Sequence, residues 1–131
     1  MVGIYFSCTG NTKYCVTKFV KSFDEQLMVV SIENDNITEL IKENDTIVFG
    51  YLVYFSNLPK IVSYFVELNA ELFKDKKVFI IAPMGFFSGD GSGILARKLK
   101  SYGSKIIGWL HIVMPDCIGD NILLKKSIKK I

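Results

Sequence analysis

The stretch SCTGNT, residues 7–12, follows an apolar run, VGIYF (residues 2–6), and leads into a segment with helical spacing, TKYCVTKFVKSF (residues 12–23). A chain that passes from a buried strand into a helix exposes the unpaired N–H groups of the helix N-terminus at that point. These groups and the helix dipole suit such a terminus to phosphate. A helix cap needs only one Ser, Thr or Asn, whereas this stretch has several polar side chains around Gly10, which favours a phosphate site. It has the spacing of neither a Walker A loop nor a dinucleotide G-x-G-x-x-G motif.

Apolar runs alternate with helical segments along the chain. We expect strands at residues 2–6, 27–32, 46–51, 77–82 and 105–113, and helices at 11–23, 37–42, 59–73, 92–101 and from 120 onward. Strands that are apolar on both faces and alternate with helices imply a parallel sheet covered on both sides. Residues 1–131 are therefore expected to form a single α/β domain, a doubly wound sandwich of five strands.

Helical spacing also predicts which side chains face the core. In the helix expected at 59–73, Pro59 suits the first turn, where its missing N–H is harmless. Gly103 suits the C-terminal end of the helix at 92–101, and Cys15 should face the core from the first helix. In the helix at 59–73 the residues expected to point inward are Ile61, Val62, Phe65, Val66 and either Leu68 or Leu72.

The loops after the third and fourth strands are rich in aromatic residues. In doubly wound sheets, ligands bind at the carboxyl ends of the strands, near the topological switch point. The loop after the fourth strand places two adjacent phenylalanines between glycines, which suits a surface loop better than a core. The two loops could therefore hold a flat conjugated ring, and with the phosphate site they describe a mononucleotide with a large aromatic head. Their aromatic residues are Tyr51, Tyr54 and Phe55 after the third strand, and Phe86 and Phe87 after the fourth.

Composition excludes several classes of protein. Half of the 131 residues are hydrophobic and 22% are charged, which is typical of a globular protein. No apolar run approaches the roughly 20 residues of a membrane helix, and no signal peptide is expected. The net charge of +3 comes from four lysines in the last seven residues, which leaves 12 basic and 13 acidic residues elsewhere. The rest of the chain therefore has no excess of basic residues, which nucleic-acid binding requires.

The three cysteines are odd in number and irregular in spacing. This pattern argues against a disulfide framework and against a zinc or iron–sulfur site. A reducing cytoplasm is therefore the expected location. Cys8 is interpreted as a small loop residue whose backbone matters, Cys117 as a loop residue, and His111 as a structural residue of the fifth strand.

The motif SCTGNT resembles the phosphate loop of flavodoxins, and the resemblance extends over essentially the whole chain. It implies a flavodoxin-like fold with strand order 2-1-3-4-5 and FMN as the cofactor. Three further stretches, GYLVYFSNLP, GFFSGDGSG and IVMPDCIGD, resemble the flavodoxin domain that clostridial-type anaerobic bacteria fuse ahead of a ferredoxin module. The cysteine runs of that ferredoxin module are absent from this chain.

The resemblance also implies which residues hold FMN. Side chains of the first loop and the backbone N–H groups of residues 8–12 would bind the phosphate, and the other two loops would line the isoalloxazine ring. The implied residues are Ser7, Cys8, Thr9, Gly10, Asn11 and Thr12, then Val53, Tyr54, Phe55, Ser56 and Asn57, then Met84, Gly85, Phe86, Phe87 and Gly89.

The sequence departs from typical flavodoxins at three points. The second loop has no tryptophan, since the single Trp109 falls on the fifth strand and is assigned to the core. Acidic residues around the predicted flavin site are nearly missing, and the last helix is short.

These observations predict an FMN-binding electron carrier, with no catalytic residue and no metal. An FMN-dependent reductase that uses NAD(P)H and a quinone or similar acceptor is one alternative, although no nicotinamide motif is found. A flavin-free interaction module is another. The expected partner is a redox protein, either a ferredoxin-type domain or a reductase, and the chain is expected to bind neither nucleic acid nor membranes and to be a monomer or weak dimer.

Overall fold

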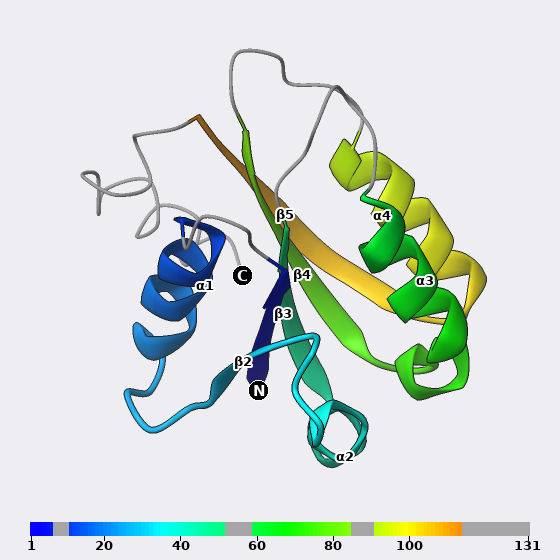
Figure 1. Cartoon of the computed structure of the whole chain (residues 1–131), viewed down its shortest axis with the longest axis horizontal. Helices are drawn as coiled ribbons and strands as arrows, with labels where there is room; N and C mark the ends of the chain where they lie inside the picture. The colour runs from blue at the N-terminus through cyan, green and yellow to red at the C-terminus, as the bar shows by residue number, and fades with distance from the viewer. Residues whose placement is uncertain (7–10, 52–58, 85–90, 114–131) are drawn as a thin grey trace.

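The computed structural model describes residues 1–6, 11–51, 59–84 and 91–113. Its elements are β1 (Val2–Phe6), α1 (Asn11–Lys21), β2 (Val29–Ser31), α2 (Ile37–Glu43), β3 (Thr46–Tyr51), α3 (Lys60–Leu68), the 3-10 helix η1 (Ala70–Phe73), β4 (Lys77–Met84), α4 (Gly91–Ser101) and β5 (Lys105–Val113). All strands pair in parallel, in the order β2-β1-β3-β4-β5 (Figure 1). The predicted fold class and strand order are confirmed.

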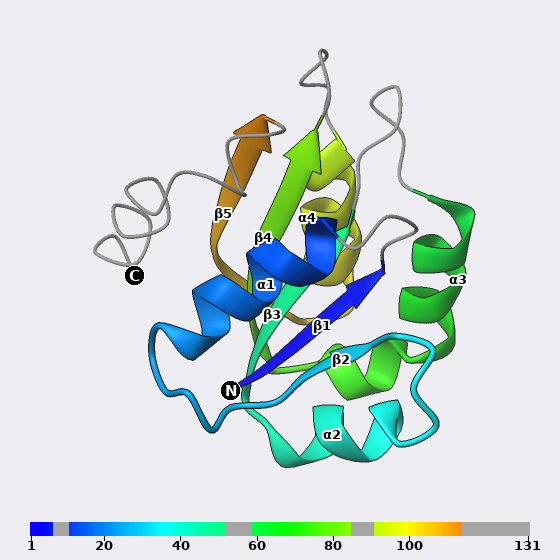
Figure 2. The ribbon, with the colours of Figure 1, turned by 60° about the vertical axis from the view of Figure 1, so that its left-hand side comes forward.

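The central strand β3 is buried on both of its faces. Successive side chains of a strand point to opposite sides of the sheet, so Ile47, Phe49 and Tyr51 enter one core and Val48 enters the other. A strand of this composition is stable only between two layers of helices. The helices provide these layers: α1 covers one face, and α2, α3 and α4 cover the other (Figures 1 and 2).

Aromatic rings join the helices to the sheet on both faces. On the α1 face, Phe19 stacks on Phe79 of β4 with ring centroids 4.6 Å apart. On the opposite face, the ring centroid of Phe49 lies 6.0 Å from that of Phe65 in α3 and 6.3 Å from that of Phe73 in η1. Aromatic pairs at such distances add to the stabilisation from buried area.

The amino edge of the sheet, where β3, β4 and β5 begin, is closed by main-chain hydrogen bonds between turns. Lys77 N donates to Asp45 O at 2.8 Å, and Lys105 N donates to Lys76 O, also at 2.8 Å. The buried Ser104 donates its hydroxyl to Phe73 O at 2.6 Å.

A glycine ends α4 at this edge, as predicted. Gly103 has a φ of +97°, a conformation that side chains rarely adopt. Its carbonyl accepts a hydrogen bond of 3.0 Å from the N–H of Asp75. The end of α4 is thereby connected to the turn that precedes β4.

The helix predicted at residues 59–73 is interrupted. α3 ends at Leu68, and the chain continues as η1 after Asn69, whose side-chain amide donates to Phe65 O at 2.8 Å. An Asn that bonds the backbone in this way competes with helix continuation. The inward assignment of Ile61 is wrong, because 40% of its surface is exposed, whereas Val62, Phe65 and Val66 are buried as predicted. Of the two leucine alternatives, Leu72 packs against the core and Leu68 is exposed.

Smaller differences concern element ends. The first helix ends at Lys21 and not at residue 23, and β2 spans three residues where six were predicted. β4 continues two residues further, to Met84. Cys15 is fully buried, which confirms its predicted orientation.

Candidate functional site

Strand ends and helix starts meet at one edge of the sheet, called the carboxyl edge here. Because the strands are parallel and the helices return antiparallel to them, α1, α3 and α4 each begin near the edge where the preceding strand ends (Figure 2). The three predicted ligand loops therefore all start and finish at this edge. The residues that bound them are Phe6 and Asn11, Tyr51 and Pro59, and Met84 and Gly91.

Helix α1 packs closely on the sheet along its length, over Gly50 near the carboxyl edge and over Gly3 near the start of β1. A Cβ atom on Gly50 of β3 would overlap Val16 Cγ2 and would lie 3.1 Å from Thr12 Cγ2. A Cβ atom on Gly3 of β1 would lie 2.9 Å from both Val16 Cγ1 and Val20 Cγ2. The two glycines thus allow α1 to sit directly over β1 and β3, and this fixes where its N-terminus lies.

Thr12, in the first turn of α1, is the predicted phosphate ligand that the structure describes most fully. Only 1% of its surface is exposed, and its methyl group points toward Gly50. Thr12 therefore has a packing role that the sequence did not indicate, in addition to its predicted role in binding phosphate. Its methyl group and its hydroxyl can be tested separately.

The helix N-termini at this edge carry little negative charge. Acidic side chains are favoured in the first turn of a helix because they complement its dipole, yet the first turns of α1 and α3 contain none. The exposed Lys13 and Lys60 lie in those turns instead. α4 also has no acid in its first turn, although Asp90 immediately precedes it in the sequence. The first turn of α1 therefore has no acid of its own to offset the positive end of the helix dipole, which suits an anion.

The predicted site residues divide into those that the structure describes and those that it does not. Asn11 and Thr12 open α1, and Met84 ends β4, so the structure brings the backbones of all three to the carboxyl edge. The predictions for the remaining thirteen stay predictions, because these residues lie outside the described ranges: Ser7, Cys8, Thr9, Gly10, Val53, Tyr54, Phe55, Ser56, Asn57, Gly85, Phe86, Phe87 and Gly89.

Tyr51 does not belong with the ring-binding loop. It is the last residue of β3 and is fully buried, with its ring 6.1 Å from that of Phe49. It is therefore part of the core on the α3 face. Its assignment to the aromatic residues of the loop after the third strand is therefore wrong.

Sequence reasoning also missed Gly50 as a residue that shapes the site. The signal was present, because a glycine inside a buried strand often marks a close approach of another backbone. In VFGY, residues 48–51, large side chains surround it. What could not be read from the sequence is that α1 is the element that approaches.

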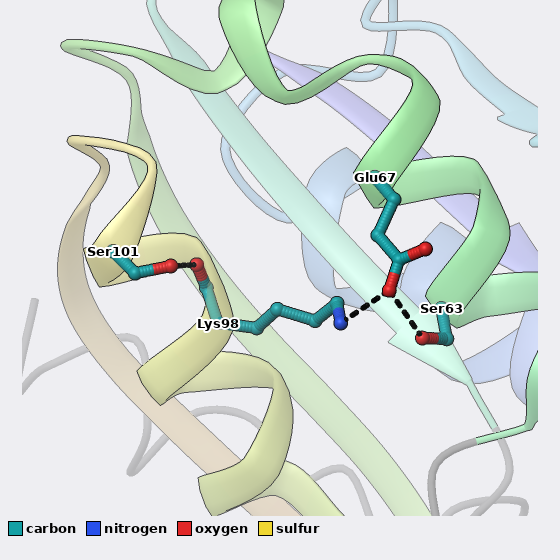
Figure 3. A network of polar contacts seen from close by, with 4 residues as sticks. All are labelled: Ser63, Glu67, Lys98 and Ser101. Carbon is teal, nitrogen blue, oxygen red and sulfur yellow. Dashed lines mark hydrogen bonds and ion pairs between the residues drawn. The ribbon is translucent and has the colours of Figure 1, made fainter.

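A polar network links α3 to α4, the helices that follow the second and third loops (Figure 3). Lys98 Nζ lies 2.6 Å from Glu67 Oε1, and Ser63 donates a hydrogen bond of 3.4 Å to the same oxygen. The hydrogen bond and charge of Lys98 hold the pKa of Glu67 below its usual value, and the hydrogen bond to Glu67 raises the pKa of Lys98. The network lies on the exposed surface and is structural.

Within the described ranges, no group of three or more His, Cys, Asp or Glu side chains could hold a metal ion. No described helix has both the length and the apolar composition needed to cross a bilayer.

Comparison with known proteins gives a consistent result. The family model described as "Flavodoxin domain" matches residues 3–104. The two-electron reduced flavodoxin of Megasphaera elsdenii is 27% identical, with a TM-score of 0.78 and full coverage of both chains. No curated protein matches the chain in a sequence search.

Two other solved structures show the same fold at lower identity. A flavodoxin from the domain Archaea is 18% identical, with a TM-score of 0.80, over 98% of this chain and 91% of the other. Oxidised flavodoxin 2 of Bacillus cereus is 19% identical, with a TM-score of 0.75, over 98% and 92% of the two chains.

Proposed function

Because the chain belongs to the flavodoxin domain family, we propose that it binds FMN at the carboxyl edge of its sheet and carries electrons between proteins. One observation carries the proposal: the N-terminus of α1 lies at that edge, with Thr12 and Val16 packed over Gly50, and its first turn has no acidic residue. This arrangement suits the phosphate of a mononucleotide. When bound, FMN supplies the redox chemistry, and the protein supplies binding, orientation and electrostatics.

The first loop would bind the phosphate, and the second and third loops would bind the ring. Ser7, Thr9, Asn11 and Thr12 would donate side-chain hydrogen bonds, together with the backbone N–H groups of residues 8–12. Residues 53–57 and 84–89 would line the two sides of the isoalloxazine. Hydrogen bonds to a charged group contribute about 1.5–3 kcal/mol each, so the phosphate would dominate the affinity.

Titration with FMN and with riboflavin tests this proposal. We expect the purified protein to bind FMN, visible as quenched flavin fluorescence and a shifted absorption spectrum. Riboflavin, which lacks the phosphate, should bind far more weakly. Equal affinities for the two would overturn the phosphate site, and no binding of either would leave the interaction-module alternative.

A second assay distinguishes an electron carrier from a reductase. The FMN-loaded protein is mixed with NADH or NADPH and a quinone, with and without a separate reductase. A carrier should consume the nicotinamide only when the reductase is present. Consumption without it would show that the protein is itself a reductase.

The proposed partner is a redox protein, either a ferredoxin-type domain or a reductase, as the sequence resemblance to the clostridial-type fusion domain would imply. We propose that the protein acts in the cytoplasm of an anaerobic bacterium and binds neither nucleic acid nor membranes. The second loop contains no acid and the third contains only Asp90. Electron transfer to the partner should therefore depend only weakly on ionic strength.

A further inference from the structure

Helix α3 exposes an apolar stripe to solvent. Ile61, Tyr64 and Leu68 are 40%, 65% and 84% exposed, although the opposite face of the same helix is buried against the sheet. Their spacing of three and then four residues places them along one side of the helix. Scattered single apolar residues on a surface need no explanation, whereas a continuous stripe indicates an interaction site.

The same side of α3 contains a hollow. Its volume is about 300 Å³, and it is lined by Lys60, Ser63, Tyr64 and Glu67. Residues at i, i+3, i+4 and i+7 form the four-residue hole into which a side chain of a facing helix inserts in knobs-into-holes packing. The exposed side chains of α3 could thus insert into the hollow of a second α3. A surface that packs against its own copy needs such self-complementary features.

The exposed charges along α3 and η1 run from positive to negative. Lys60 lies at the N-terminal end of the stripe, Glu67 lies near its C-terminal end, and the exposed Glu71 follows in η1. Glu67 already forms an ion pair with Lys98, with Nζ and Oε1 2.6 Å apart. The exposed Glu71 is therefore the acid that could pair with a lysine of a second copy. Two copies related by a twofold axis across α3 would run antiparallel, so that Lys60 of each copy would face Glu71 of the other.

We propose that the exposed side of α3 is a self-association surface that takes a second copy of this chain in an antiparallel, twofold arrangement. Tyr64 and Leu68 of one copy pack against the hollow and stripe of the other, and two Lys60–Glu71 pairs flank them. Three exposed apolar side chains per copy make a small surface compared with the roughly 800 Å² per partner of a standard interface. The dimer is therefore weak and forms at high protein concentration.

Sedimentation velocity of the full chain tests the surface, at concentrations from about 10 μM to about 1 mM, a range that covers weak association. The wild-type protein should shift from monomer toward dimer as its concentration rises. Leu68→Glu should raise the dissociation constant at least tenfold without lowering the melting temperature, because Leu68 is mostly exposed. Met28→Glu is the matched control, since Met28 is 53% exposed and lies away from α3, and it should dimerise like the wild type.

Charge reversal tests the antiparallel arrangement and the identity of the partner. Lys60→Glu and Glu71→Lys should each weaken self-association, because each creates two like-charge pairs. An equimolar mixture of the two variants should associate again, because both pairs in the mixed dimer then join opposite charges. A wild-type chain that stays monomeric throughout, an unaffected Leu68→Glu variant, or a mixture that stays monomeric would each overturn the proposal.

Discussion

The two edges of the sheet are built in different ways. At the amino edge, turns bond to one another through their main chains, as in the hydrogen bonds from Lys77 N to Asp45 O and from Lys105 N to Lys76 O. Near the carboxyl edge, α1 packs on Gly50 of β3 through the methyl groups of Thr12 and Val16. The amino edge thus pairs main-chain groups of its own turns, whereas α1, α3 and α4 begin at the carboxyl edge, where FMN is proposed to bind. The comparison implies that substitutions at the amino edge change stability, whereas those at the carboxyl edge change binding.

Gly50→Ala should have the largest effect. It lies near the carboxyl edge, yet it should lower both stability and FMN affinity, so it challenges the division between the two edges. The new Cβ would overlap Val16 Cγ2 in a buried position where neither group has room to move. Overpacking of this kind typically costs about 1–3 kcal/mol. Chemical denaturation should show that loss of stability, and FMN affinity should fall as α1 is displaced.

A double substitution checks that cause. Val16→Ala alone should destabilise the protein because it leaves a cavity. In the Gly50→Ala background the same change should cost clearly less, since it relieves the overlap. Strictly additive effects would show that the two residues do not collide.

Substitutions of Thr12 should show separately how its hydroxyl contributes to FMN binding and how its methyl group contributes to stability. Thr12→Val keeps the methyl group over Gly50 and removes the hydroxyl, so FMN should bind about 1–2 kcal/mol more weakly. Thr12→Ser keeps the hydroxyl and removes the methyl group, which should lower stability by about 1 kcal/mol and leave FMN affinity nearly unchanged. FMN titration and denaturation of both variants measure the two effects, and the reverse pattern would contradict the predicted phosphate contact.

Ser104→Ala is the corresponding test at the amino edge. It removes the buried hydrogen bond to Phe73 O and should lower the free energy of unfolding by about 1 kcal/mol. FMN affinity should not change, because Ser104 lies at the opposite end of the sheet from the predicted loops. A large loss of FMN binding in a variant that remains folded would show that the two edges are coupled.

Lys98→Met should have the smallest effect, because exposed ion pairs contribute little to stability. The lowered pKa of Glu67 means that its contribution is present above its ordinary value of 4.5 and is lost as the pH falls through the folded-state pKa. The raised pKa of Lys98 means that its contribution is present below 10.5 and is lost as the pH rises through the folded-state pKa. Melting temperatures of the wild type and Lys98→Met should therefore differ slightly near neutral pH and converge at both extremes, with Lys100→Met as the control.

The interior of the fold was predictable, because burial on both faces leaves a plain signal in the sequence. The bounds of the interior strands β1 and β3 were predicted to the residue. Errors occurred where exposure and local hydrogen bonds decide the structure. β2 is an edge strand and only partly buried, so its ends are weakly specified, and Asn69 ends α3 through a side-chain bond that helical periodicity does not reveal.

The candidate site was predictable in its location and less so in its packing. Polar residues around a glycine between a strand and a helix indicate the N-terminus of α1 as an anion site. The same pattern does not reveal that Thr12 is buried against Gly50, because that contact joins residues far apart in the sequence. Nor could periodicity show that Ile61 and Leu68 lie on the exposed side of α3.

The packing of α1 on Gly50 has a consequence for the order in which the elements of the fold assemble. β1 and α1 are neighbours in the chain, yet the surface on which α1 rests is complete only when β3 has paired with β1. Such long-range contacts require loop closure before they stabilise the structure. The proposed phosphate site is therefore a late product of folding, and FMN uptake during refolding would report that the centre of the sheet has assembled.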